Sequence, residues 1–200
     1  MTTTTPDVAE VFFNITGLAV CGVASNGTYS GDVVLLTYPQ SCNMEFLHDE
    51  IDLQAGGLTV EVANIFRHVN FGLSGGALDR TAYNIMTGNT SSSSGSTPNQ
   101  VFTTGATAGG FGTPYFGLVL AVAGVNGANS LFGLPRAKVT FPNLTVEQNT
   151  FVVQEYSGKG LASTNANSTF PNMPFIKRDY ESAAALPASA AEFDTFFGVS

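Results

Sequence analysis

Apolar and polar residues alternate along much of the chain, with the period of two that is typical of β-strands with one buried face. The clearest example is Arg136–Phe141, in which Ala137 and Val139 are separated by charged or hydroxyl residues. Val33–Tyr38, a run of β-branched, aliphatic and aromatic residues, predicts a further strand. Two more strands are predicted at Leu144–Glu147 and Phe151–Tyr156, and Asn126-Gly127 predicts a hairpin turn.

The alternation changes phase in one long segment. Leu58–Val62 has its apolar residues in one phase, whereas Ile65–Leu73 has them in the other. A β-bulge near Ala63–Phe66 would produce this slip, because a bulge inserts one extra residue into one strand. Arg67 then falls among apolar positions, so we expect it to lie at a sheet edge or to contact a partner.

Two short helices are predicted where the apolar spacing departs from the strand period. Ala77–Met86 carries apolar residues at helical spacing, and Gly88 stands where a C-terminal cap belongs. A second helix is expected after Ser189, because Ser189 and Glu192 have the spacing of a capping box and phenylalanines follow.

The 200 residues suit a single domain, 1–200, that is large enough to bury a core. We expect flexible residues at 1–6 and a loop at 87–112, which is rich in Ser, Thr and Gly and poor in charge. The loop is not a domain linker, because the strands after it need partners from before it. Residues from about 162 to 200 are expected to form an extended C-terminal arm.

The surface chemistry favours self-association over binding to nucleic acid or membrane. Charged residues make up 11% of the chain, against about 25% in a typical soluble domain. Seven Lys and Arg residues against 15 Asp and Glu residues give a net charge of −8. Tight binding to DNA or to an anionic membrane needs clustered cations, whereas net acidity lets DNA pass without sticking. No membrane partner and no tight DNA contact are therefore expected.

Catalytic motifs are weak. Gly72–Gly76 matches the G-x-S-x-G pattern of a nucleophile elbow. A hydrolase of that class needs a histidine after the serine, but His48 and His68 both precede Ser74. We therefore expect a glycine-rich turn here, assign no catalytic residue, and do not expect an enzyme.

Metal and redox chemistry are equally unsupported. Glu45–Asp52 contains four carboxylates and His48 and could hold a divalent cation, but it lacks the spacing of an EF-hand. A solvated, flexible acidic loop is the favoured interpretation, and no metal or cofactor is assigned. Cys21 and Cys42 are expected to be free thiols, since two cysteines make no disulfide framework.

Four blocks in a fixed order resemble siphophage-type tail-tube (major tail) proteins of bacteriophages. The resemblance extends over about half to three-quarters of the chain, and the order of the blocks carries it more than any single motif. The blocks are Gly56–Gly88, a long strand, small-residue turn and short helix; Ser96–Asn99; Thr113–Leu120; and Leu134–Thr140, followed by a strand ending at Glu155.

The resemblance implies a fold and an assembly. The fold is all-β dominated, a β-sandwich or barrel of two sheets with one flanking short α-helix. Six copies close into a ring, and rings stack into a tube through which DNA passes. The partners are then further copies of the chain and other tail proteins at the tube ends. The protein would be made in the host cytoplasm and end in the virion.

Candidate residues for this assembly follow from the strand pattern. Glu61 and Glu147 point away from the apolar faces of their predicted strands, which makes them candidates for the lumen. Candidates for contacts between rings are Asp49, Glu50, Phe196 and Phe197. Deletion of Glu192–Ser200 is expected to leave folded subunits that no longer polymerise.

Two alternatives remain open at this stage. A tail terminator or a capsid decoration protein would have a similar fold, and a terminator would form single rings and stop. A secreted jelly-roll module that binds carbohydrate would use exposed aromatics and an acidic calcium loop. The absence of tryptophan and of an evident signal peptide counts against the carbohydrate-binding module.

Overall fold

The computed structural model describes most of the chain. It covers residues 12–36, 39–55, 58–75, 80–88, 113–124, 129–140, 143–145, 153–165, 168–180 and 184–199. Within these ranges, only the backbone is described at 12–13, 50–55, 58–65, 80, 143–145 and 153–154. The expectations for residues 1–6 and for the turn at 126–127 lie outside the described residues. Of the loop expected at 87–112, Thr87 and Gly88 instead end α1, and the remainder lies outside the described residues.

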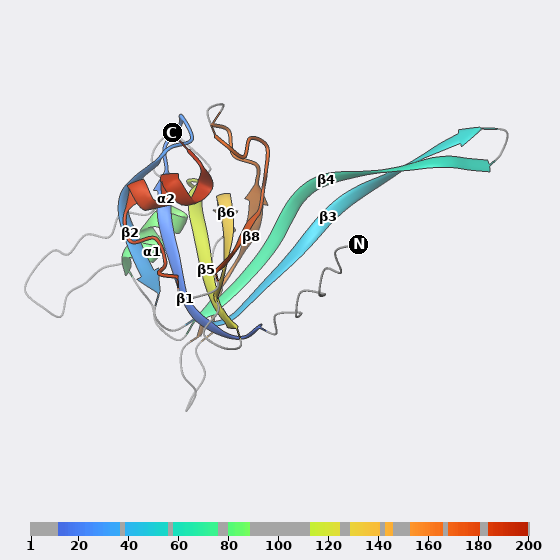
Figure 1. The fold of residues 1–200 in the computed structure, drawn as a ribbon. Coiled ribbons are helices and arrows are strands. Elements are labelled where there is room, and N and C mark those ends of the chain that lie inside the picture. Colours follow the sequence, from blue (N-terminus) through green and yellow to red (C-terminus); the bar gives the residue numbers. More distant parts are fainter. Residues whose placement is uncertain are drawn as a thin grey trace, which may run out of the picture.

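The described strands form one antiparallel sheet in the order β2-β1-β5-β6-β8-β4-β3 (Figure 1), with β7 paired to β8 and β9 to β6. The prediction of an all-β-dominated fold is confirmed, although the strands join into one continuous sheet instead of two. The strands are β1 (Phe12–Val23), β2 (Tyr29–Leu36), β3 (Pro39–Ala55), β4 (Leu58–Gly75), β5 (Phe116–Gly124), β6 (Asn129–Val139), β7 (Asn143–Thr145), β8 (Val153–Leu161) and β9 (Ile176–Tyr180). The helices are α1 (Arg80–Thr87) and α2 (Ala190–Phe197).

The central strand β5 is buried on both faces, which explains its unbroken apolar sequence. Leu118 and Leu120 belong to a first core together with residues of β1, β4, β6 and α1. Val119 and Ala121 point to the opposite face and belong to a second core under α2. The sheet therefore separates two cores, and α1 and α2 serve different ones.

Both helices end as the sequence predicts. Gly88 has a φ of 73°, and its N–H donates to the carbonyl of Asn84, which closes α1. At the start of α2, the hydroxyl of Ser189 accepts from the N–H of Glu192. Gly198, with a φ of 65°, caps the other end of α2 in the left-handed conformation.

The C-terminal region is not the extended arm that the sequence led us to expect. β9 pairs with β6, and α2 lies across the sheet (Figure 1). Phe193, Phe196 and Phe197 are between 0 and 5% exposed. Three aromatic side chains on one helix face gain more by covering the subunit's own apolar strands than by remaining in water. Deletion of Glu192–Ser200 would remove part of the core, so folded subunits are no longer expected from it.

Candidate assembly surfaces

The β3–β4 hairpin extends beyond the body of the molecule. β4 pairs with β8 only over Val69–Gly75, whereas its register with β3 continues to Leu58 opposite Ala55. Figure 1 shows the two strands leaving the sheet together as a long ribbon. The acidic segment Glu45–Asp52, which we expected to be a flexible loop, is part of β3 in this ribbon. Pairing with β4 holds this segment extended, since Glu45–Asp52 is in register with Val62–Asn70.

A β-bulge marks the ribbon near the body. Leu47 pairs with His68 and His48 with Phe66, which leaves Arg67 as the extra residue on β4. The predicted bulge is therefore present, one position beyond the expected range. The Nε atom of Arg67 contacts the Oδ2 atom of Asp49, and both side chains are exposed. This ion pair links the two strands of the ribbon across the bulge.

Aromatic rings gather where the hairpin meets the body. The rings of Phe46 and Phe175 meet edge to face at 5.0 Å, and Phe132 lies 6.1 Å from Phe175. Phe46 is nevertheless 42% exposed. A groove of about 210 Å³ runs along these rings and is lined by Cys42, Met44, Phe46, Leu120, Phe132 and Phe175. The hairpin base thus carries apolar surface that the subunit does not cover.

The outer face of β3, β4 and β8 is polar. It holds a shallow hollow of about 340 Å³ lined by Ser41, Asn43, Gly72, Leu73, Ser74, Glu155, Tyr156 and Ser157. The hydroxyls of Ser41 and Ser74 share a hydrogen bond of 2.7 Å. Gly72–Gly75 belong to β4 instead of the glycine-rich turn that we expected, and the hydroxyl partner of Ser74 is a second serine. Of the described residues, those lining the hollow offer hydroxyls, one amide and the carboxylate of Glu155, and no histidine is among them.

The sheet presents two edges that the subunit does not pair. Within the described residues, β2 pairs only with β1 and β3 pairs only with β4. Leu35 of β2 is 47% exposed. Unpaired backbone N–H and C=O groups on such edges are available to a strand from another chain.

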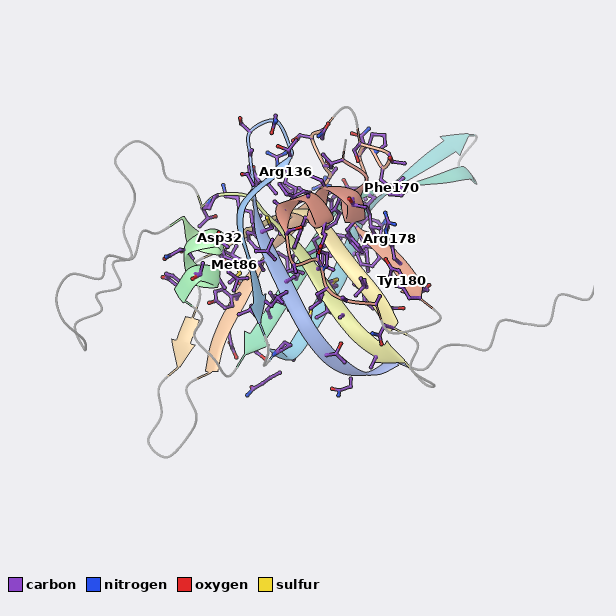
Figure 2. All side chains as sticks on the ribbon, turned by 60° about the vertical axis from the view of Figure 1, so that its left-hand side comes forward. Asp32, Met86, Arg136, Phe170, Arg178 and Tyr180 are labelled. Atoms are coloured by element: carbon purple, nitrogen blue, oxygen red, sulfur yellow. The ribbon has the colours of Figure 1, made fainter. Side chains whose placement is uncertain are left out.

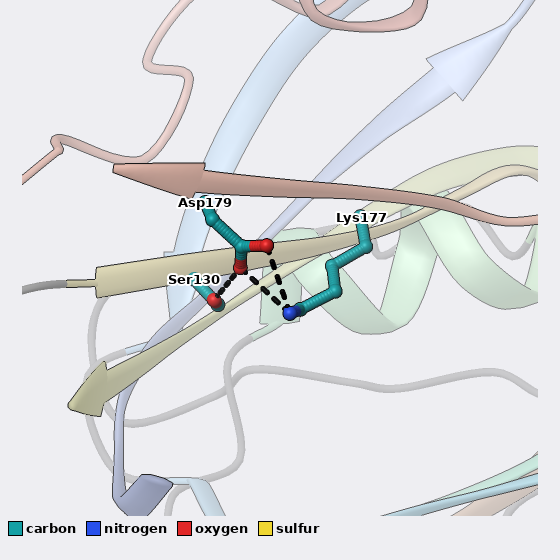
Figure 3. Close-up of polar contacts among 3 residues, drawn as sticks. All are labelled: Ser130, Lys177 and Asp179. Carbon is teal, nitrogen blue, oxygen red and sulfur yellow. Dashed lines mark hydrogen bonds and ion pairs between the residues drawn. The ribbon is translucent and has the colours of Figure 1, made fainter. Parts of the chain in front are cut away.

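The pair β6–β9 is fixed by a small polar network. The carboxylate of Asp179 accepts from the hydroxyl of Ser130 and from Nζ of Lys177 at 2.9 Å (Figure 3). The hydrogen bonds from Lys177 and Ser130 hold the pKa of Asp179 below its ordinary value. This network anchors β9 to the sheet and has no feature of a ligand site.

The two thiols are unpaired. Cys21 is buried and Cys42 is partly buried, and no disulfide joins them, as predicted. Burial raises the pKa of each thiol to about 11. Thiolates are the reactive form, so neither cysteine is suited to nucleophilic chemistry near neutral pH.

The structure brings some of the predicted site residues together and separates others. Asp49, Glu50 and Glu61 all lie on the β3–β4 hairpin, where Glu61 is the register partner of Leu53. Glu147 lies outside the described residues. Phe196 and Phe197 are buried in the subunit's own second core, so their side chains offer no exposed surface to a neighbouring ring.

Other features were missed by the sequence analysis. Phe46 interrupts the acidic run in β3, and this apolar residue among carboxylates is the signal that could have revealed the groove. No group of three or more metal-ligating side chains occurs among the described residues. In the same part of the chain, no helix is long and apolar enough to cross a membrane.

No protein-family model matches the sequence, and a search of curated proteins gives no match. Among solved structures, the chain is similar to the tube-terminating cap of the anti-feeding prophage (TM-score 0.46, 12% identity, covering 90% of this chain and 100% of that chain). It is also similar to the sheath/tube terminator of PVC, an extracellular contractile injection system, in the extended state. The TM-score is 0.44 and the identity 9%, and the match covers 86% of this chain and 99% of that chain. A third similar structure is the 6-fold symmetrised baseplate of the anti-feeding prophage. Here the TM-score is 0.39 and the identity 9%, with 88% of this chain and 97% of that chain covered.

Proposed function

We propose that this chain is a structural subunit that self-assembles into the ring-shaped parts of a phage-tail-like tube. The observation that carries the proposal is the β3–β4 hairpin: among the described strands, the outer part of each of its two strands pairs only with the other. A two-stranded hairpin in water is marginally stable at best. A neighbouring copy that packs on the hairpin would stabilise it.

The unpaired edges of β2 and β3 support the same proposal. They lie at opposite ends of the sheet order, so each subunit offers two different edges. Contact between unlike surfaces of identical subunits generates a ring when the rotation closes and a filament when it does not. The resemblance of the sequence to tail-tube proteins, together with its low charge, agrees with such an assembly.

The exposed aromatic groove adds a reason for association. Phe46 and the groove beside it lie at the base of the hairpin, next to the unpaired edge of β3. Burial of apolar surface contributes about 25 cal/mol per Å². A contact that covers the hairpin and the groove would therefore combine strand pairing with apolar burial.

The proposal is tested by negative-stain electron microscopy and sedimentation velocity on the purified chain. We expect rings or tubes; stacked rings would indicate a tube subunit, and single rings a terminator. A variant in which Asn-Gly replaces residues 49–65 joins the register partners His48 and Phe66 by a tight turn. It should keep the circular dichroism and thermal midpoint of the body but remain monomeric.

A matched control keeps the hairpin length and changes its turn, by substituting Asn-Gly for Gly56-Gly57. It should assemble as the parent chain does. A parent chain that stays monomeric at high concentration, or a shortened variant that assembles as well as the parent, would overturn the proposal.

A further inference from the structure

Three basic residues form a ridge on adjacent strands of this acidic subunit. Lys138 of β6 is the direct register partner of Lys159 of β8, and Arg136 stands two residues before Lys138. Ala137 and Val139, which alternate with them, are buried in the first core. Arg136, Lys138 and Lys159 therefore share the opposite, outward face. We name these three residues the basic ridge.

Contacts with one tyrosine hold two charges of the basic ridge close together. The guanidinium of Arg136 lies 3.7 Å from the ring centroid of Tyr115, and Nζ of Lys138 lies 5.3 Å from it. Ion pairs among the described residues join Arg67 to Asp49 and Lys177 to Asp179, and neither involves the ridge. Like charges directly opposite on a sheet are destabilising. An anionic partner would remove this repulsion.

The β3–β4 hairpin supplies matching charge. Beyond the part of β4 that pairs with β8, it contains the carboxylates Asp49, Glu50, Asp52 and Glu61 and the cation Arg67. Four negative charges and one positive charge give this outer part a net charge of −3, whereas Glu45 pairs with Asn70 inside the body. Figure 1 shows that the ribbon runs away from the body, so it does not fold back onto its own β6 and β8.

We infer that the basic ridge receives the acidic β3–β4 hairpin of a second copy of this chain. The inference rests on the proposed self-assembly and specifies which surfaces meet. Two subunits of net charge −8 repel one another overall, so association needs local charge complementarity at the contact. The ridge and the hairpin are the complementary pair that every copy carries.

The inference is tested by charge reversal on each side of the contact. The ridge variant is Lys138→Glu/Lys159→Glu, and the hairpin variant is Glu50→Lys/Asp52→Lys. Each alone should raise the protein concentration needed for assembly by about tenfold or more, because attraction becomes repulsion at the contact. Mixed in equal amounts, they should assemble again, since the acidic ridge of one meets the basic hairpin of the other.

Ala191→Glu is the control, because it adds a negative charge at an exposed position of α2, outside β6, β8 and the hairpin. It should assemble within about twofold of the parent chain. Circular dichroism of every variant establishes that the monomer is folded. Higher salt should weaken the assembly of the parent chain more than that of the ridge variant.

The outcomes separate the two proposals. A parent chain that stays monomeric overturns the self-assembly and the ridge contact together. A parent that assembles while the ridge variant assembles equally well, or a mixture that fails to recover, overturns the ridge contact alone. Binding of a short DNA duplex by the parent monomer, lost in the ridge variant, would assign the ridge to nucleic acid and would also overturn it.

Discussion

Arg178 of β9 donates a hydrogen bond from Nη2 to the carbonyl oxygen of Phe196 in α2 at 2.7 Å. The guanidinium also lies 5.2 Å from the ring centroid of Phe196 and 5.7 Å from that of Phe170. Figure 2 shows Arg178 and Phe170 beside one end of α2. A cation at the C-terminal end of a helix satisfies its last carbonyls and interacts favourably with its dipole. This residue therefore fastens the C-terminal helix to the sheet.

Arg178→Met should lower the free energy of unfolding by about 1–3 kcal/mol, because it keeps the apolar stem and removes the donors. Urea denaturation measures the change. Lys177→Met, which removes an exposed ion pair with Asp179, is the control and should cost at most about 1 kcal/mol. Equal losses in the two variants would contradict the role given to Arg178.

Gly133 of β6 lets α2 approach the sheet closely. A Cβ atom at this position would lie 2.5 Å from Cε1 of Phe196 and 2.7 Å from Cε1 of Phe197. Gly133→Ala should therefore displace the helix and destabilise the fold by about 1–3 kcal/mol. The loss should shrink when Gly133→Ala is combined with Phe196→Leu, which a double-mutant cycle measures. Strict additivity would show that the two residues do not compete for this space.

The hydroxyl of Tyr29 joins the start of β2 to β6. It donates to the carbonyl of Pro135 at 2.7 Å, and the ring stacks on Phe197 with centroids 5.2 Å apart. Tyr29→Phe keeps the ring but leaves a buried carbonyl without its donor, so we expect a loss of about 1–2 kcal/mol in denaturant unfolding. Tyr29→Leu should cost more, because it also removes the ring contacts. Equal stability of the parent and Tyr29→Phe would contradict this assignment.

The free energy of unfolding should fall as the pH rises from 9 to 11. Burial raises the pKa of Cys42 from 9.0 to about 11 in the folded chain. The unfolded thiol therefore ionises first, and the stabilisation is complete below pH 9 and lost as the pH approaches 11. Cys42→Ala should flatten the dependence relative to the parent, as measured by urea midpoints across this range. An unchanged slope would show that Cys42 does not contribute to it.

Removal of residues 192–200 should abolish folding. The deletion takes away Phe193, Phe196 and Phe197, which the structure places in the second core. Phe197→Ala alone should cost about 3–5 kcal/mol. Circular dichroism and limited proteolysis of the two variants give the measurement. A deletion variant with the parent's thermal midpoint would show that these residues belong to an extended arm after all.

Local signals predicted much of the fold. The alternation of apolar and polar residues predicted the strand around Arg136–Thr140, and a change in the phase of that alternation predicted the bulge beside Arg67. Capping residues predicted the end of α1 and the start of α2. Each of these signals acts over a few residues. Burial of β5 on its second face depends on α2, which is the last element along the chain and is far from β5 in sequence. No short-range pattern encodes that contact, so the C-terminal region was expected to be an arm.

The candidate surfaces were less predictable than the fold. The acidic segment in β3 was expected to be a loop because strand prediction from a sequence depends on an apolar face, and this segment carries four carboxylates. The basic ridge was invisible because Lys138 and Lys159 come together only through the register of β6 and β8. Glu61 and Asp49 were named for different roles, yet they lie on one hairpin.

The two edge strands β2 and β3 differ in length, sequence and surroundings. Copies joined through these two edges would be arranged head to tail, so all subunits of a ring would point in the same direction around it. If the stacked rings all have the same orientation, the first ring would expose one face of the subunit and the last ring the opposite face. Proteins that begin and complete such a structure would therefore have to recognise different faces of the same subunit.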